Sequence, residues 1–159
     1  EFGDRLKNLG MNDSEIDLGR RFLANISIIT EARIAAEFNA TSALHDVTEG
    51  GLATAMEELS IAGGHRIKIN IETIPVYPQT GKICQLLDID PLGLIGSGSL
   101  LICCREAACD NLVAAIGKAG IDVTCIGEVL QPGCGITAEK DRQPVPWPQF
   151  ETDEITRLF

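Results

Sequence analysis

The sequence predicts an α+β fold, with a mixed, largely antiparallel sheet and helices layered on one face of it. Helical and strand patterns intermix along the 159 residues, and apolar residues make up 45% of them, enough for the core of a single domain. In residues 66–72, Ile67, Ile69 and Ile71 alternate with polar residues. This alternation indicates a strand with one buried and one exposed face, as antiparallel sheets often have.

Helices are predicted where apolar residues recur at three- and four-residue spacing. The first helical segment covers residues 4–25, and Asn12, Asp13 and Ser14 provide a start signal inside it. A second helix is expected from about Ser27. The remaining helices are expected at residues 52–63, where Gly63-Gly64 ends the pattern, at 80–87, and at 106–119, where Gly120 follows.

Strands are predicted where short apolar runs end at turn residues. They are expected at residues 41–46, 66–72, 99–104, 122–130 and 135–140. Turns are expected at Asp90-Pro91 and Pro132-Gly133. Three prolines within residues 144–148 predict a stiff extended tail rather than a helix.

The composition narrows the range of partners. A formal net charge of −10 argues against nucleic acid or an anionic membrane surface as the main partner. The sequence has no apolar run that approaches the roughly 18 residues of a membrane span, and it does not open with a signal-peptide pattern. We therefore expect a cytoplasmic protein that binds neither nucleic acid nor membrane.

The six cysteines do not have the spacing of a metal site. None forms a C-x-x-C pair, and only two histidines accompany them, so no metal ligands are predicted. Cys103, Cys104 and Cys125 lie inside apolar runs. The cysteines are therefore expected to be reduced and mostly buried thiols.

Residues 43–56, ALHDVTEGGLATAM, place a polar turn between a predicted strand and a predicted helix. The turn contains four polar residues and a glycine pair: His45, Asp46, Thr48, Glu49, Gly50 and Gly51. Backbone amides at a helix start lack partners within the helix, and glycines allow a ligand to approach closely, so the turn suits a phosphate or another anion. Alternatively, the Thr48 hydroxyl caps the helix and no ligand is needed.

A second glycine turn, Gly96-Ser97-Gly98, precedes the predicted strand at 99–104. Such a turn alone is weak evidence, because similar sequences occur in many hairpins and β-bulges. Two flexible turns at the edges of one sheet can nevertheless converge on a common cleft. We take that convergence as the hypothesis for the site.

Four motifs follow one another along the chain. They are HDVTEGGL at residues 45–52, IPV at 74–76, DPLGLIGSGSLLI at 90–102 and IGEV at 126–129. In this order they resemble the C-terminal domain of the aminoimidazole ribonucleotide (AIR) synthase-related superfamily, and the first motif is most similar to the HypE-like branch. The resemblance implies such a domain at 27–142, after an N-terminal helical segment at 1–26 and before the Pro-rich extended tail at 143–159.

The resemblance implies an ATP-dependent enzyme of two domains that activates an oxygen-bearing substrate by phosphorylation. A preceding N-terminal domain would bind ATP and Mg²⁺ and dominate a homodimer. This chain would supply the substrate side, hold no cofactor tightly and be inactive alone. The substrate would be a small molecule or a protein tail. By resemblance, the ligand- or phosphate-binding residues are Thr48, Glu49, Gly50, Gly51, Gly96, Ser97 and Gly98, and the catalytic candidates are His45 and Asp46.

Two features depart from the HypE-like pattern. Ser97 stands where that pattern has an acidic residue, and the sequence ends at Thr156–Phe159 whereas HypE proteins end in a cysteine that receives a carbamoyl group. The resemblance therefore implies an enzyme of unassigned substrate. The alternative is a non-catalytic binding, regulatory or oligomerisation module that retains the fold.

Overall fold

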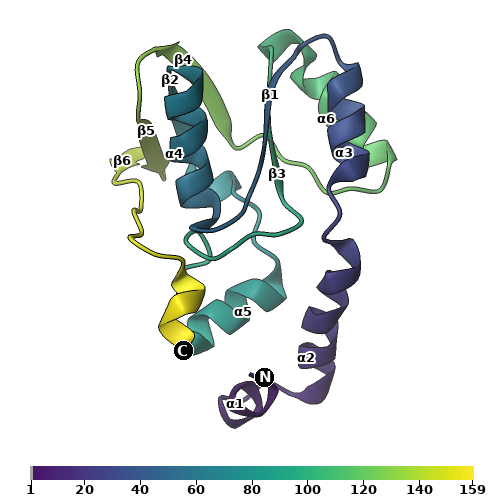
Figure 1. Ribbon diagram of the computed structural model, residues 1–159, viewed down its shortest axis with the longest axis vertical. Coiled ribbons are helices and arrows are strands. Elements are labelled where there is room, and N and C mark those ends of the chain that lie inside the picture. The colour runs from purple at the N-terminus through teal and green to yellow at the C-terminus, as the bar shows by residue number, and fades with distance from the viewer. Residues whose placement is uncertain (1) are drawn as a thin grey trace.

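The strands of the protein form two separate sheets, seen in the computed structural model, which describes residues 2–159 (Figure 1). In the smaller sheet, β1 (Thr41–Asp46) pairs antiparallel with β3 (Leu100–Cys104). The larger sheet has the order β4-β2-β5-β6, with bounds Gly127–Pro132, His65–Asn70, Ile136–Lys140 and Gln143–Val145. Strand β2 pairs antiparallel with β4 and parallel with β5, and β5 pairs antiparallel with β6. The predicted α+β class with mixed, largely antiparallel pairing is confirmed, and the strands divide into two sheets.

Helices pack against both sheets (Figure 1). The α-helices are α1 (Gly3–Asn8), α2 (Asp13–Arg20), α3 (Ile29–Glu37), α4 (Gly51–Gly63), α5 (Pro78–Leu87) and α6 (Cys109–Lys118), and the short 3₁₀ helices are η1 (Arg21–Asn25), η2 (Ile71–Thr73), η3 (Glu106–Ala108) and η4 (Glu154–Leu158). Helices α3 and α6 contact each other, and α3 packs on both strands of the smaller sheet. Helix α4 packs on β2 and β5 and also contacts β1, so it lies between the two sheets.

Three clusters of buried side chains form the core. One joins the N-terminal helices to α5 through Leu6, Met11, Ile16, Cys84, Leu87 and Ile89. The second joins α3 to α6 through Ala35, Leu112 and Ile116. The third joins α4 to β2 through Met56, Ile67 and Ile69, so the predicted alternating burial along β2 is confirmed for these two isoleucines. None of the helices in residues 2–159 has the length and apolar character needed to cross a membrane.

Several predicted boundaries are confirmed by local hydrogen bonds. Asn12 forms a capping box with Glu15 at the start of α2, as its start signal predicted. Strand β1 has the predicted bounds. Helix α4 ends where Gly64 adopts a left-handed conformation, with φ of 65°.

Two predicted strand boundaries are wrong. The strand expected at 66–72 ends at Asn70, because the Asn70 side chain accepts a hydrogen bond from the Glu72 amide and begins η2. The strand expected at 122–130 begins only at Gly127. Before that residue, Ile121 and Val123 pack against the α3–α6 cluster instead of entering the sheet.

The C-terminal segment is only partly extended. Residues 143–145 form β6, but residues 154–158 form η4, which begins because the Asp153 side chain accepts a hydrogen bond from the Ile155 amide. The domain boundaries at residues 26 and 142 stay a prediction.

The six cysteines are free thiols, but the expectation that most are buried is wrong. Only Cys84 is buried, and Cys125 and Cys134 are exposed. The reason is that Cys125 lies in the loop before β4 and Cys134 in the turn before β5, rather than inside strands.

Candidate functional site

The turn between β1 and α4 requires glycine at two consecutive positions. Gly50 has φ of 78° and Gly51 has φ of 64°, in the left-handed region that other residues rarely adopt. A Cβ atom on Gly51 would also lie 2.5 Å from the carbonyl oxygen of Leu92 and 2.7 Å from that of Leu94. Gly51 therefore lets the loop at 90–95 come into direct contact with the start of α4.

The two glycine turns singled out in the sequence lie together. The Val47 amide donates to the Ser99 carbonyl oxygen at 3.1 Å, and the Ala53 amide donates to the Leu92 carbonyl oxygen at 2.9 Å. A Cβ atom on Gly96 would lie 2.7 Å from the Val47 side chain. The two turns thus come together, while a common cleft between them and the binding role of their residues stay predictions.

The predicted site residues differ in exposure. Thr48, Glu49 and Ser97 are exposed, whereas Gly50 and Gly51 are buried. Gly98 does not contact Val47 in the way that Gly96 does. A Cβ atom on Gly98 would lie against backbone atoms of Asn25 and Ile26 instead. The exposed edge of the two turns is therefore formed by polar side chains, and the glycines lie beneath it.

The start of α4 is capped by a residue that sequence reasoning missed. Asp153 Oδ2 accepts a hydrogen bond from the Gly50 amide at 2.9 Å, and Asp153 is only 8% exposed. The Gly51 amide donates to the Thr48 carbonyl oxygen, so Thr48 contributes its backbone. The alternative of a Thr48 hydroxyl cap is therefore wrong: the cap is a carboxylate from 103 residues further along the chain.

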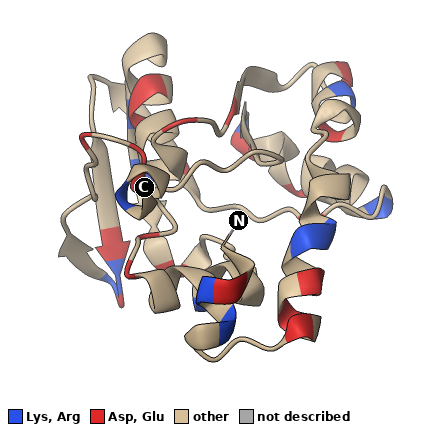
Figure 2. Ribbon diagram, turned by 60° about the horizontal axis from the view of Figure 1, so that its bottom comes forward, with Lys and Arg blue, Asp and Glu red and all other residues tan. Residues whose placement is uncertain are grey.

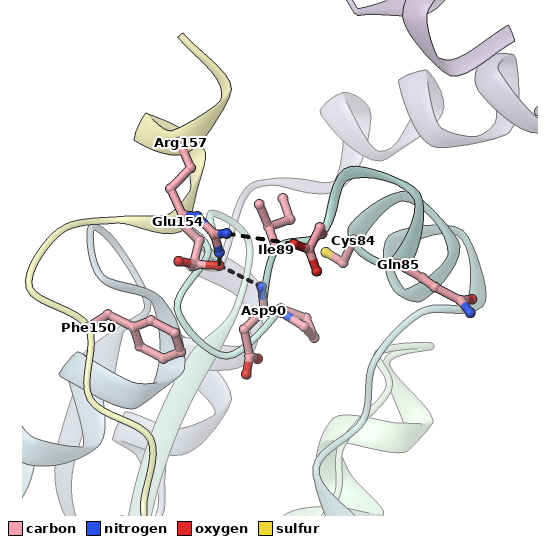
Figure 3. A pocket seen from close by; sticks show the side chains of 9 residues that line it. Cys84, Gln85, Ile89, Asp90, Phe150, Glu154 and Arg157 are labelled. Carbon is pink, nitrogen blue, oxygen red and sulfur yellow. Dashed lines mark hydrogen bonds and ion pairs between the residues drawn. The ribbon is translucent and has the colours of Figure 1, made fainter. Parts of the chain in front are cut away.

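Residues 150–157, which we name the C-terminal strap, also hold the loop at 90–95. The Glu154 carboxylate accepts from the Asp90 amide at 2.8 Å and from the Arg157 guanidinium at 2.8 Å (Figure 3). The Glu154 amide donates to the Gly93 carbonyl oxygen at 3.0 Å. The Phe150 ring covers Gly93 so closely that a Cβ atom there would lie 2.6 Å from it.

A groove of about 490 Å³ opens beside the strap. It is lined by the end of α5, by residues 88–91 and by Phe150, Glu154 and Arg157 (Figure 3). Among the described residues that line it, none belongs to either glycine turn. The groove and the turns are therefore neighbouring features joined by the loop at 90–95.

His45 and Asp46, the two catalytic candidates, have different environments. His45 Nε2 lies 3.1 Å from Glu58 Oε2 on α4, and its Nδ1 lies 2.6 Å from the Asp46 carbonyl oxygen. Both partners are acceptors, so the imidazole satisfies both only when each ring nitrogen carries a proton. The Asp46 side chain is 61% exposed, with its carboxylate 3.8 Å from His45 Nδ1. Asp46 is thus the more accessible of the two groups.

Most of the chain matches a known protein family. Residues 11–138 match the family described as AIR synthase related protein, C-terminal domain. Among curated proteins, carbamoyl dehydratase HypE of Cupriavidus necator is 39% identical over 92 residues, which cover 57% of this chain and 26% of that protein. Carbamoyl dehydratase HypE of Escherichia coli is 33% identical over 91 residues, which cover 56% of this chain and 27% of that protein. The matches thus span about a quarter of the length of these relatives.

Solved structures share the fold. The crystal structure of E. coli HypE, a hydrogenase maturation protein, superposes with a TM-score of 0.67 at 27% identity, over 77% of this chain and 40% of that one. HypE in the HypE–HypF complex gives 0.63 at 26% identity, over 73% of this chain and 39% of that one. A HypE solved in complex with ATP gives 0.63 at 22% identity, over 72% of this chain and 37% of that one.

Proposed function

This chain belongs to the AIR synthase-related family, whose C-terminal domain it matches over residues 11–138, and on that premise we propose that it is the substrate-side domain of an ATP-dependent enzyme. The enzyme is HypE-like and activates an oxygen-bearing substrate by phosphorylation. It is complete only with an N-terminal ATP-binding domain. The substrate is a small molecule or a protein tail.

The observation that carries the proposal is the contact between the two glycine turns at the start of α4. The bonds from Val47 to Ser99 and from Ala53 to Leu92 join them into one edge. Thr48, Glu49 and Ser97 are exposed along that edge and are the proposed ligand contacts. Gly51 and Gly96 allow the segments beneath it to approach one another, because a Cβ atom there would clash with the loop at 90–95 or with Val47.

The charges at this edge bear on how a phosphate is held. Asp46 and Glu49 are exposed carboxylates, so they repel a phosphoryl group unless a cation lies between them. Within residues 2–159, no group of three or more His, Cys, Asp or Glu side chains could hold a metal ion. These residues do not fit a resident Mg²⁺ site, and we assign Mg²⁺ binding, with ATP, to the N-terminal domain.

Asp46 is the proposed catalytic residue and His45 its positioning neighbour. Asp46 is accessible to a substrate at the edge, whereas both ring nitrogens of His45 face acceptors within the chain. A homodimer formed through the N-terminal domains, and contact with a protein that delivers the substrate, complete the proposal. The support for a protein partner is that the HypE neighbour was solved with HypF.

The direct test is nucleotide titration of the intact protein that contains this chain, with and without Mg²⁺. We expect binding that depends on Mg²⁺, and ATP turnover when an acceptor with a carbonyl, amide or similar oxygen is present. An intact protein that neither binds nor hydrolyses ATP with any such acceptor contradicts the proposal.

A binding or regulatory module is the second candidate. The observation that favours it is the bond from Gly50 to Asp153, because an amide at the predicted anion site already has a partner within the chain. This candidate predicts that the intact protein binds ATP or the acceptor without turnover. A single-turnover measurement with the purified intact protein, ATP and the acceptor distinguishes the two candidates: the enzyme converts the bound ATP, and the binding module does not.

A further inference from the structure

The buried carboxylate of Asp153 lies at the point where the sequence predicted an external anion. We propose that Asp153 is a positioning residue of the candidate site. Its carboxylate occupies the anion position at the start of α4 and holds the turn at Gly50-Gly51 in place. The assignment of Asp153 to a binding site rests on the proposed function, whereas its contacts with Gly50 and Ile155 do not. A ligand phosphate is then bound at the exposed edge of the turn, away from the Gly50 amide.

Asp153 caps two helices with one side chain. Its Oδ1 accepts from the Ile155 amide at the start of η4, and its Oδ2 accepts from the Gly50 amide at the start of α4, both at 2.9 Å. Both helix starts present partial positive charge, so a carboxylate between them is stabilised from two sides. An external anion at Gly50 would have to displace a group that is held by its own helix.

The strap that carries Asp153 is anchored on either side of it. Phe150 covers Gly93, and the buried Glu154 binds the Asp90 amide, the Gly93 carbonyl oxygen and Arg157. These contacts fix the backbone of Asp153 independently of its side chain. We therefore assign it a fixed positioning role instead of that of a mobile arm that leaves the site when a ligand arrives.

The other amides at the start of α4 support the same conclusion. The Gly51 amide donates to the Thr48 carbonyl oxygen, and the Ala53 amide donates to the Leu92 carbonyl oxygen. The chain thus supplies acceptors to Gly50, Gly51 and Ala53, groups that a helix start otherwise leaves for a ligand or water. Only Asp153 among these acceptors carries a charge.

Amide hydrogen exchange in the full chain, followed by NMR, tests the role of Asp153. In Asp153→Ala, exchange of the Gly50 amide is expected to accelerate about ten- to a hundredfold, the factor that corresponds to a lost hydrogen bond to a charged group. Exchange at Ile67 and Ile69 in β2 is expected to stay unchanged. Added formate is expected to slow Gly50 exchange again in this variant and to have no effect in the native chain.

Two variants serve as controls. Glu151→Gln removes an exposed carboxylate from the same strap and is expected to leave Gly50 exchange unchanged. Asp153→Asn keeps an acceptor oxygen without the charge, and is expected to accelerate Gly50 exchange less than alanine does. If Asp153→Ala does not fold, the exchange rate of the Gly50 amide is measured in Asp153→Asn instead. The proposal is overturned if Gly50 exchange is the same in native and Asp153 variants, if Ile69 loses as much protection as Gly50, or if formate slows Gly50 exchange in the native chain.

A functional measurement separates this inference from the proposed function. With Mg²⁺-ATP, an oxygen-bearing acceptor and the intact protein, Asp153→Ala is expected to lower ATP turnover about tenfold, and formate is expected to restore it. Turnover unaffected by the substitution overturns the positioning role. If the native intact protein binds no ATP at all, the proposed function fails, and the exchange rates at Gly50 still decide the role of Asp153.

Discussion

Single residues determine how closely the segments of the candidate site approach one another. At Gly51, a left-handed φ coincides with backbone contact from the loop at 90–95, so both the conformation and the space exclude a side chain. Gly93 is restricted in another way, because the Phe150 ring covers it. These glycines are therefore required by packing, whether or not a ligand is bound.

Gly51→Ala is expected to lower the free energy of unfolding by about 2–4 kcal/mol, because it combines a strained φ with overpacking against backbone atoms. Gly117→Ala is the matched control: it lies in α6, nothing is within 4 Å of its Cβ position, and a gain of about 0.5 kcal/mol is expected. Urea unfolding of both variants measures the difference. Equal effects would show that the contact with Leu92 and Leu94 relaxes without cost.

Asp46→Ala is expected to reduce activity much more than stability. Because its side chain is 61% exposed, the free energy of unfolding should change by less than about 0.5 kcal/mol. ATP turnover by the intact protein should fall about a hundredfold or more, the range for loss of an acid–base group. Asp122→Ala, in the exposed loop before β4, is the control for removing one charge. A parallel loss of stability and turnover would favour a structural role for Asp46.

Cys84 makes the stability of the chain depend on alkaline pH. Burial, followed by the nearby charges of Asp90 and Glu154, raises the pKa of the Cys84 thiol from 9.0 to about 11. The folded chain therefore keeps the proton that the unfolded chain loses above pH 9.0, and stability falls as pH rises towards about 11. The loss is at most about 2–3 kcal/mol. Unfolding midpoints across this range should decline less steeply in Cys84→Ala, and an unchanged slope contradicts the assignment.

At the scale of elements, local signals predicted what local interactions determine. The capping box at Asn12 and the end of α4 at Gly64 follow from hydrogen bonds and dihedrals within a few residues. The predicted start of β4 was wrong because an apolar run does not indicate which surface its side chains pack on. Ile121 packs on the α3–α6 cluster. Strand pairing was also not predictable, since β2 has one antiparallel and one parallel neighbour.

Ser60 links three elements, and its removal tests how far their packing depends on one hydroxyl. Ser60 is 1% exposed on α4; it donates to the His65 carbonyl oxygen at 2.7 Å and accepts from the Gly135 amide at 2.9 Å. Ser60→Ala leaves both backbone groups without this partner, and a loss of about 2–3 kcal/mol in the free energy of unfolding is expected. Ser14→Ala, exposed on α2, should change it by less than about 0.5 kcal/mol. A small loss at Ser60 would show that water replaces the hydroxyl.

At the scale of the whole molecule, the site depends on contacts between distant parts of the sequence. The two glycine turns were identified from composition and order alone, and the structure brings them together through Val47 and Ser99. Asp153 was not identified, because no pattern in a single sequence connects it to Gly50 over 103 residues. The local signal at Asp153 is its role as the N-cap of η4. That helix was not expected, because the prolines at 144–148 predicted an extended tail.

Net charge is also a property of the whole chain, and it predicts the direction of the salt dependence. The chain carries a net charge of −10, and its acidic and basic residues are scattered over several helices and loops (Figure 2). Salt screens repulsion and attraction alike, but the excess of carboxylates makes repulsion the larger contribution in the folded chain. Added NaCl should therefore increase the free energy of unfolding at pH 7, by less than about 1 kcal/mol, the scale of exposed charge interactions.

Urea unfolding at low and at physiological ionic strength measures this effect, provided that the dependence on urea concentration keeps the same slope. Asp122→Lys is the matched variant, because it replaces one negative by one positive charge at an exposed position and brings the net charge from −10 to −8. The gain in stability from salt should be smaller in this variant. A native chain that loses stability on addition of salt would show that attractive pairs, such as Lys68 with Glu139, outweigh the repulsion.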